Sequence, residues 1–227
     1  MACYEGFDMA QPITVTEATA WWGTSPFTWM GYYLGGCCAT TSWTGYISYS
    51  SLSQIGWGVR PIYVGQQVDD SYFGCGCSPL TNPISQAQSD ANNAASLAKG
   101  AGFPAGAMIY LDIENVPGMS ITNGSAIAQY INEWLYWITQ GGNGYAGGIY
   151  TTGAYANQIN SIGLNPVFWI ACYPGGTYTC PTSCTCYNYP YSWQYKDKVS
   201  RTYNNVTLTI DLDNSDSTGT GGQSPGN

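Results

Sequence analysis

The stretch that decides the fold is residues 107–114, AMIYLDIE, a mostly apolar strand that runs into two acids. Residues 115–118, NVPG, then end the strand. Because side chains alternate along a strand, Asp112 and Glu114 share one face while Ile113 points the other way. Two neighbouring carboxyls raise the pKa of one and leave the other ionised, which acid–base chemistry uses. The pair indicates either a functional site or a solvated structural rim.

The composition narrows the chemistry that these acids can perform. The chain has 227 residues, of which only 8% are charged, and a net charge of -8. It contains no histidine, which excludes a Ser-His-Asp triad, a Cys-His pair and a histidine zinc site. With only five Lys and Arg residues, nucleic acid is not an expected partner. No apolar run reaches the roughly 20 residues of a membrane span, and we expect neither a metal nor a cofactor.

The cysteines indicate an oxidising compartment. The cluster at residues 180–186 lacks paired C-x-x-C spacing, which argues against zinc, so we expect disulfides and an extracellular protein, secreted or at the cell surface. One odd cysteine remains as a free thiol, or for an intermolecular disulfide and self-association. Sequons at Asn123 and Asn205 permit N-glycosylation in a eukaryote. The nine cysteines are Cys3, Cys37, Cys38, Cys75, Cys77, Cys172, Cys180, Cys184 and Cys186.

Apolar runs and helical patterns alternate along the chain. The predicted strands are 4–8, 29–34, 59–64, 107–114, 147–150, 167–171, 192–195 and 207–211. The predicted helices run from Thr14 or Thr16 to Trp22, and over 51–55, 82–99, 125–139 and 153–162. Residues 69–81 are predicted as a disulfide-stapled loop. We expect one domain over residues 1–214, followed by a flexible Ser/Thr/Gly-rich tail over 215–227.

The order of these elements predicts an α/β fold, a (β/α) barrel with about eight strands. Helices follow the first five strands, and loops replace them near the C-terminus. Apolar runs such as residues 108–111 fit strands covered on both faces, as a parallel sheet requires. A β-rich sandwich is the alternative, and the two long helices between strands argue against it.

Acidic residues gather at the predicted strand ends. Of the thirteen in the chain, five lie there: Asp8, Asp112, Glu114, Asp211 and Asp213. In a barrel of this type the C-terminal ends of the strands converge on one mouth, where active sites lie. Any single Asp fits an ordinary turn, but five together predict a site.

Carboxylates without histidine favour the cleavage of glycosidic bonds. That reaction needs one protonated acid for the leaving oxygen and one ionised group to stabilise an oxocarbenium-like centre. Flat aromatic rings near the strand ends would stack on sugar faces. The candidates for stacking are Tyr33, Tyr173, Trp193 and Tyr195.

Several short motifs, in a fixed order, resemble a known family. They are residues 6–8 (GFD), 62–67 (IYVGQQ), 106–114, 147–150 (GGIY), 169–171 (WIA), 193–195 (WQY) and 211–213 (DLD). Over about residues 4–214 the chain is similar to the DUF1906 (Rv2525c-like) glycoside-hydrolase-like domain, a relative of the family 25 lysozymes. The resemblance implies a TIM-like barrel whose last three strands lack regular helices. The cysteine-rich loops after the second, third and sixth strands depart from the family pattern.

The resemblance also implies roles for the acids. Glu114 would be the catalytic acid, and Asp112 would assist the substrate's N-acetyl group as internal nucleophile. Asp8 and Asp211 would shape the sugar subsite, and substrate assistance would make the reaction retaining. The residues expected to bind substrate are Gln66, Tyr33, Tyr173, Trp193, Gln194, Tyr195 and Asp213.

The sequence thus predicts a secreted glycoside hydrolase that acts on an N-acetylhexosamine-containing polysaccharide, either peptidoglycan or a chitin-like polymer. The alternative is a non-catalytic carbohydrate-binding or structural surface protein that self-assembles on the same barrel, which the odd cysteine, the sequons and the few charges favour. A third hypothesis is a disulfide-stapled effector or inhibitor that uses the barrel only as a scaffold. An open groove past Glu114 would favour the first.

Overall fold

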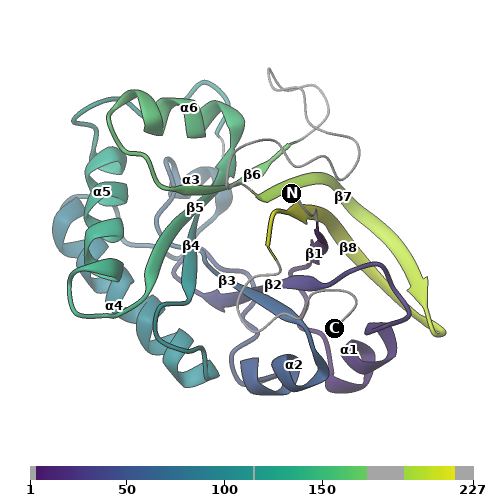
Figure 1. Ribbon diagram of the computed structural model, residues 1–227. Helices are drawn as coiled ribbons and strands as arrows, with labels where there is room; N and C mark the ends of the chain where they lie inside the picture. The colour runs from purple at the N-terminus through teal and green to yellow at the C-terminus, as the bar shows by residue number, and fades with distance from the viewer. Residues whose placement is uncertain (1–3, 115, 173–191, 218–227) are drawn as a thin grey trace.

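The computed structural model describes residues 4–114, 116–172 and 192–217, and its strands close into a barrel in the order β1 to β8 (Figure 1). The strands are β1 Tyr4–Asp8, β2 Trp29–Gly35, β3 Gly58–Tyr63, β4 Met108–Ile113, β5 Ala146–Thr152, β6 Val167–Ala171, β7 Ser192–Tyr203 and β8 Val206–Ser215. The helices are α1 Val15–Trp21, α2 Tyr49–Ile55, α3 Asp70–Phe73, α4 Pro83–Ala101, α5 Ala126–Thr139 and α6 Gly153–Ser161. The predicted barrel is confirmed.

The last strand runs against its neighbours. Strands β1 to β7 pair in parallel, but β8 is antiparallel to both β7 and β1. Asn204 and Asn205 join β7 to β8 with φ angles of 46° and 63°, the left-handed geometry of a two-residue hairpin turn. In the register of β8 with β1, Asp211 lies opposite Asp8. The barrel therefore closes with a hairpin.

Helices α1, α4 and α5 begin at the caps that the sequence predicts, whereas α2 begins at Tyr49, two residues before its predicted start. Thr14 and Glu17 form a capping box at α1, Asn82 caps α4 ahead of Pro83, and Ser125 caps α5. In Figure 1 the long helices α4 and α5 lie side by side on the outside of the barrel. The predicted stapled loop contains the short helix α3, and the connection from β6 to β7 falls in residues 173–191, outside the described residues.

Aromatic side chains fill the middle of the barrel. The Trp169 ring centroid lies 5.2 Å from that of Trp29, 5.6 Å from Tyr110 and 5.3 Å from Tyr150. Glycines on the strands make room for these rings. A Cβ atom on Gly148 would lie 2.8 Å from the Tyr110 ring, and one on Gly6 would clash with the Trp29 ring. This aromatic layer separates the mouth of the barrel from its opposite end.

The opposite end of the barrel is closed around Arg60, which is 5% exposed. Its guanidinium lies 4.5 Å from the centroid of the Trp29 ring. It donates to the hydroxyls of Tyr110, Ser192, Ser215 and Ser217. Ser215 is buried and is the last residue of β8, so the strand ends one residue beyond 214, where the sequence placed the end of the domain. The predicted tail from residue 218 onward lies outside the described residues.

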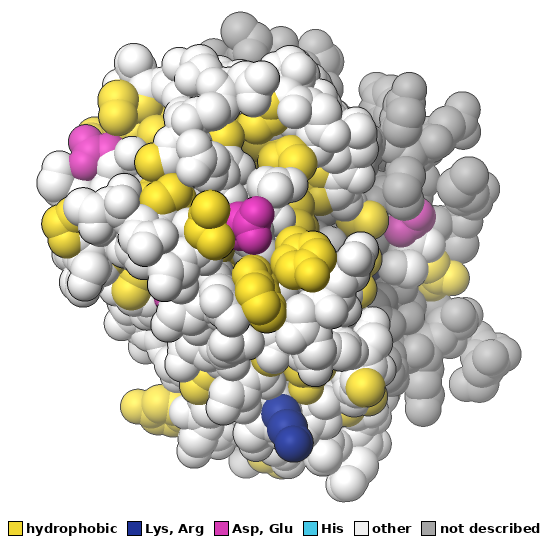
Figure 2. Space-filling model, turned by 90° about the vertical axis from the view of Figure 1, so that its left-hand side faces the viewer, with side chains coloured by type: hydrophobic (Ala, Val, Ile, Leu, Met, Phe, Trp, Pro, Cys, Tyr) yellow, Lys and Arg dark blue, Asp and Glu magenta, His cyan; other side chains and the backbone are white. Residues whose placement is uncertain are grey.

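The surface carries few charges. On the face shown in Figure 2, Asp, Glu, Lys and Arg side chains are isolated and most of the surface is uncharged. Hydroxyl, amide and small side chains therefore make up most of the surface that contacts water. Within the described part of the chain, none of the helices has both the length and the apolar character that crossing a bilayer requires.

Candidate active site

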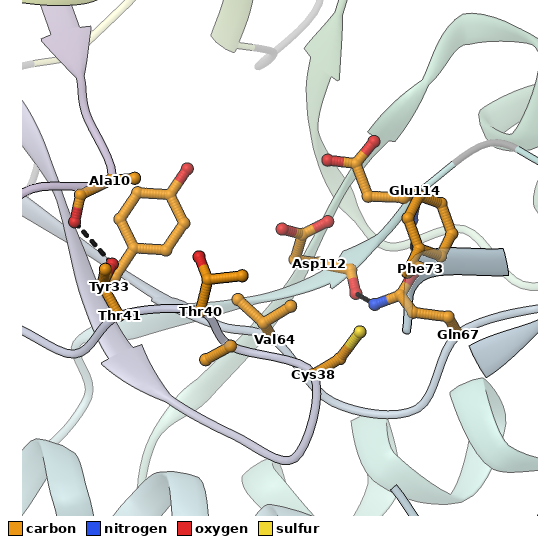
Figure 3. Close-up of a pocket in the computed structure, with 11 residues that line it drawn as sticks. Ala10, Tyr33, Cys38, Thr40, Thr41, Val64, Gln67, Phe73, Asp112 and Glu114 are labelled. Carbon is orange, nitrogen blue, oxygen red and sulfur yellow. Dashed lines mark hydrogen bonds between the residues drawn. The ribbon is translucent and has the colours of Figure 1, made fainter. Parts of the chain in front are cut away.

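The end of β4 presents its two acids to one cavity. Asp112 is the fifth residue of β4 and is 4% exposed, while Glu114 follows the strand and is partly exposed. Gln67 fixes the backbone between them, because its Nε2 donates to the Asp112 carbonyl at 2.8 Å and its Oε1 accepts from the Glu114 N–H at 2.7 Å. In Figure 3 both carboxyl groups point into the same space. The predicted side-by-side placement is confirmed.

The cavity has a volume of about 240 Å³. Figure 3 shows Tyr33 facing the two acids from the other side, with the loop that follows β2 forming the wall between. Phe73 of α3 and Glu114 both line this cavity. The lining residues are Ala10, Tyr33, Cys38, Ala39, Thr40, Thr41, Val64, Gln67, Phe73, Asp112 and Glu114.

A hydrogen-bond network joins Asp8 to the other side of the mouth. Tyr33 donates its hydroxyl to Asp8 Oδ1 at 2.9 Å, and Gln194 donates its amide to Asp8 Oδ2 at 2.7 Å. The same amide lies 3.4 Å from Asp211 Oδ2, and the Gln194 carbonyl oxygen accepts from the Tyr150 hydroxyl at 3.0 Å. Gln194 is therefore held as a donor between two acids, and the network joins Asp8, Asp211, Tyr33 and Gln194, all four of them site candidates from the sequence.

Burial and mutual repulsion raise the pKa of every acid at this mouth. Burial, then repulsion from Asp211, raises the pKa of Asp8 to about 7. Burial first, then Glu114 and Asp8, raises the pKa of Asp112 well above its ordinary range. The pKa of Glu114 is raised by burial and by Asp211. Among the described residues, Oδ1 of Asp112 has no hydrogen-bond partner. The raised pKa values favour protonated carboxyls at the mouth, and Asp112 Oδ1 offers an unsatisfied acceptor.

The last strand brings its acids to the site differently from the prediction. The sequence placed Asp211 and Asp213 at the C-terminal end of a parallel strand, which is wrong because β8 is antiparallel. Asp211 reaches the mouth from the middle of β8 and accepts the Lys198 N–H at 2.6 Å. Asp213 is fully buried in the middle of the barrel and accepts from the Trp169 indole at 3.0 Å. It does not line the cavity.

Three of the residues predicted to bind sugar lie elsewhere. Trp193 and Tyr195 flank the inward-pointing Gln194, so strand alternation turns both toward the outer core. Gln66 is buried and donates its amide to the Ser78 carbonyl at 3.1 Å. Tyr173 lies outside the described residues. Of the four aromatic candidates, Tyr33 therefore lines the cavity.

Gln67 and Phe73 are the two most informative of the lining residues that sequence reasoning missed. Gln67 directly follows Gln66, but both lie beyond Tyr63, the last residue of β3, where the alternation of the strand no longer tells inward from outward. Phe73 belongs to the predicted stapled loop, which two disulfides tie to the loop after β2 at the mouth. The doubled glutamine was a visible signal, whereas no signal in the sequence distinguished Phe73.

The cysteine-rich loops are cross-linked at the mouth. Disulfides join Cys37 to Cys77 and Cys38 to Cys75, and Cys172 is disulfide-bonded as well. Asp70 lies near Cys38 and Cys75, but the disulfide occupies both sulfurs, so this group is not a metal site. The glycosylation candidates Asn123 and Asn205 are both exposed. The remaining cysteines lie outside the described residues: Cys3, Cys180, Cys184 and Cys186.

A closed barrel with buried carboxyls at its mouth is an architecture that suits a glycoside-hydrolase-like domain. The chain belongs to the Rv2525c-like, glycoside hydrolase-like domain family, whose sequence profile matches residues 19–216. This confirms the resemblance drawn from the motifs. A comparison with curated proteins found no match.

Solved structures share this fold at low sequence identity. An uncharacterized B. stearothermophilus protein is 18% identical, with a TM-score of 0.60 over 94% of this chain and 96% of that one. The Tat-secreted protein Rv2525c of Mycobacterium tuberculosis is 16% identical, with a TM-score of 0.58 over 93% of each chain. A muramidase from Acremonium alcalophilum is 20% identical, with a TM-score of 0.57 over 92% of each chain.

Proposed function

We propose that this protein is an extracellular glycoside hydrolase that cleaves an N-acetylhexosamine-containing polysaccharide, either peptidoglycan or a chitin-like polymer. One observation carries the proposal: Asp112 and Glu114 lie side by side in a cavity, in surroundings that raise the pKa of both. The muramidase that shares the fold supports the choice of substrate. The disulfides support the extracellular location.

Glu114 is the acid in this proposal, because it is the more accessible of the two groups. Burial, then repulsion from Glu114 and Asp8, raises the pKa of Asp112 well above its ordinary range, which favours the protonated form of Asp112 in the free protein. An acetamido N–H placed at its unpartnered Oδ1 would favour the ionised form of Asp112. Glu114 is the neighbouring carboxyl that can take up the released proton. Substrate binding would in this way create one acid and one carboxylate.

The reaction follows from that proton arrangement. Glu114 gives its proton to the leaving glycosidic oxygen as the bond to the anomeric carbon breaks. The acetamido carbonyl oxygen forms a bond to the same carbon, and Asp112 stabilises the positive charge on the acetamido group. Water then attacks the anomeric carbon, breaks its bond to the acetamido oxygen and gives a proton to the Glu114 carboxylate. Two displacements at one carbon retain the configuration.

The test measures reducing ends released from peptidoglycan and from chitin-like polymer. Glu114→Gln should lose about 10²- to 10⁴-fold in rate, because an amide cannot donate the proton. Glu133→Gln on α5 is the matched control and should retain the parent rate. For the parent enzyme the rate should fall as the pH rises through the raised pKa of Glu114. Equal rates for Glu114→Gln and the parent would remove Glu114 as the acid.

Carbohydrate binding without turnover is the second candidate function. The cavity of about 240 Å³ is smaller than the usual ligand pocket of about 300–1,000 Å³, and the cross-linked loop after β2 closes one of its sides. This function would appear as saccharide binding of equal strength in the parent and in Glu114→Gln, with no release of reducing ends by either. The odd cysteine would then serve the predicted self-association, measured as a reducible dimer in solution.

A further inference from the structure

A second cavity adjoins the first on the outer side of α3. Its volume is about 560 Å³, and Gln67 lines both cavities. One wall is the segment from Val68 to Leu80, which includes α3. The facing wall is formed by Met119, Ser120 and the first residues of α5. The α3 segment (residues 67–80) thus stands between a space beside Glu114 and a larger space further out.

Phe73 is the aromatic residue of this segment that borders the inner cavity. Its side chain is 36% exposed, and it lines the same cavity of about 240 Å³ as Glu114 (Figure 3). The neighbouring Tyr72 meets it edge-on, with ring centroids 5.0 Å apart, so one face of Phe73 is not used by that contact. An aromatic ring left exposed at a cavity rim forgoes most of its stabilising burial, and a stacked ligand restores it.

The α3 segment is rigidly held. Two disulfides, Cys37–Cys77 and Cys38–Cys75, tie it to the loop after β2 that lines the inner cavity. Within the segment, Asp69 accepts the Ser71 N–H at 3.0 Å, and Asp70 accepts the Gln67 N–H at 2.8 Å. A preorganised wall loses little conformational entropy when a ligand binds to it.

The lining of both cavities indicates an uncharged occupant. Hydrogen bonds from Ser71 hold the pKa of Asp69 below its ordinary value, so the outer cavity carries a negative charge. Asp70 lines the same cavity, and Asp112 and Glu114 line the inner one. Such walls repel a carboxylate-bearing ligand. Exposed Met119 and partly buried Leu80 give the outer cavity apolar surface that suits the face of a sugar ring.

We propose that the α3 segment forms an additional subsite that binds a neutral N-acetylhexosamine chain, with Phe73 stacking on the sugar next to Glu114 and the outer cavity holding the adjoining units. This inference rests on the proposed function for the identity of the ligand. It assigns a substrate-binding role to a cross-linked segment that departs from the family's sequence pattern. It also makes Phe73, rather than Trp193 or Tyr195, the aromatic platform on this side of the site.

The test is calorimetric binding of chitohexaose and chitotriose to Glu114→Gln protein, in which the proposed turnover is reduced by about 10²- to 10⁴-fold. Adding Phe73→Ala should raise the Kd for chitohexaose about 10-fold, equivalent to about 1.4 kcal/mol. Phe73→Tyr, which keeps the ring, should leave the Kd within a factor of about two. Tyr46→Ala, at another exposed aromatic that lines neither cavity, is the matched control and should also leave it unchanged.

The outer cavity is tested by the dependence on chain length. Ser120→Trp should fill that cavity and remove the advantage of chitohexaose over chitotriose, while the Kd for chitotriose stays the same. Equal Kd values for Phe73→Ala and its parent, no dependence on length, or no binding of chitohexaose would each overturn this inference. The proposed function is judged separately, by reducing-end release from peptidoglycan and chitin in the parent and in Glu114→Gln.

Discussion

At the mouth of the barrel, carboxyl groups lie close to one another, whereas at the opposite end a single guanidinium is surrounded by hydroxyls. Besides burial, repulsion from Glu114 and Asp8 raises the pKa of Asp112. Repulsion from Asp211 raises the pKa of Asp8 and of Glu114. Arg60 donates to neutral oxygens and lies over the ring of Trp29. The aromatic layer around Trp169 separates the two groups of charges. The Arg60 guanidinium therefore does not form ion pairs with the carboxyls at the mouth.

The two ends therefore affect stability in opposite directions. A buried charge is tolerated when hydrogen bonds satisfy it and is costly when like charges surround it. Arg60 meets the first condition, so its removal should destabilise the fold. The carboxyls at the mouth meet the second, so their neutralisation should stabilise the fold while harming the proposed chemistry. Such a trade of stability against activity is common at functional sites.

The largest expected effect is at Asp8. Its pKa is raised from 3.8 to about 7 in the folded protein, so its contribution to stability is complete below about pH 4 and is lost as the pH rises to about 7. Asp8→Asn removes this loss. Relative to the parent, the variant should gain on the order of 4 kcal/mol in unfolding free energy between pH 3.5 and pH 8.

Urea unfolding of the parent and Asp8→Asn at both pH values checks this prediction. Glu133→Gln, at an acid on α5 away from the mouth, is the control and should follow the parent. If the curves of Asp8→Asn and the parent against pH are parallel, Asp8 is not the group that causes the loss.

The next effect is at the opposite end of the barrel. Arg60→Met should lower the unfolding free energy by about 3 kcal/mol, because it leaves buried hydroxyls of Tyr110, Ser192 and Ser215 without their donor. Arg60→Lys should recover only part of this loss, since an ammonium lacks the forked donors of a guanidinium. Chemical denaturation measures both variants, and an Arg60→Met protein as stable as the parent would contradict the contrast between the two ends.

The smallest effect concerns the space beside the acids. A Cβ atom on Gly31 would lie 2.7 Å from Asp8 Cβ and 3.1 Å from the Trp169 ring, so Gly31→Ala should cost about 2 kcal/mol. Gly100 lies within α4 with no atom within 4 Å of the added Cβ, and Gly100→Ala should add up to about 1 kcal/mol. Thermal unfolding of both variants should show shifts of opposite sign, and two shifts of the same sign would rule out steric crowding as the cause.

Much of this fold was accessible from the sequence. Local signals at Asn82-Pro83 and at Ser125 marked both long helices, and apolar runs marked the strands. The direction of β8 was missed, although Asn204-Asn205 between two strand patterns is a hairpin signal. A two-residue turn cannot join parallel strands. The error came from assuming that every strand of the barrel is parallel, although this turn makes β7 and β8 an antiparallel hairpin.

The candidate site was predictable to the extent that strand alternation reaches. Alternation along β4 placed Asp112 and Glu114 on one face. The same rule along β7 turns Trp193 and Tyr195 away from the face of Gln194, but the sequence analysis did not apply it there. Beyond a strand end the alternation stops, which is why Gln66 was chosen over Gln67. Phe73 depends on which of nine cysteines pair, and disulfide connectivity does not follow from sequence alone.

The pairing of β1 with β8 affects when the site assembles during folding. Asp8 lies on the first strand of the chain, and both Asp211 and the hairpin that carries Gln194 lie on the last two. Synthesis proceeds from the N-terminus, and pairing of distant segments is the slow part of folding. The acids at the end of β4 are made midway, but their partners across the mouth arrive only when the final hairpin has been synthesised. Assembly of the site is thus a late event, which coincides with the closing of the barrel itself.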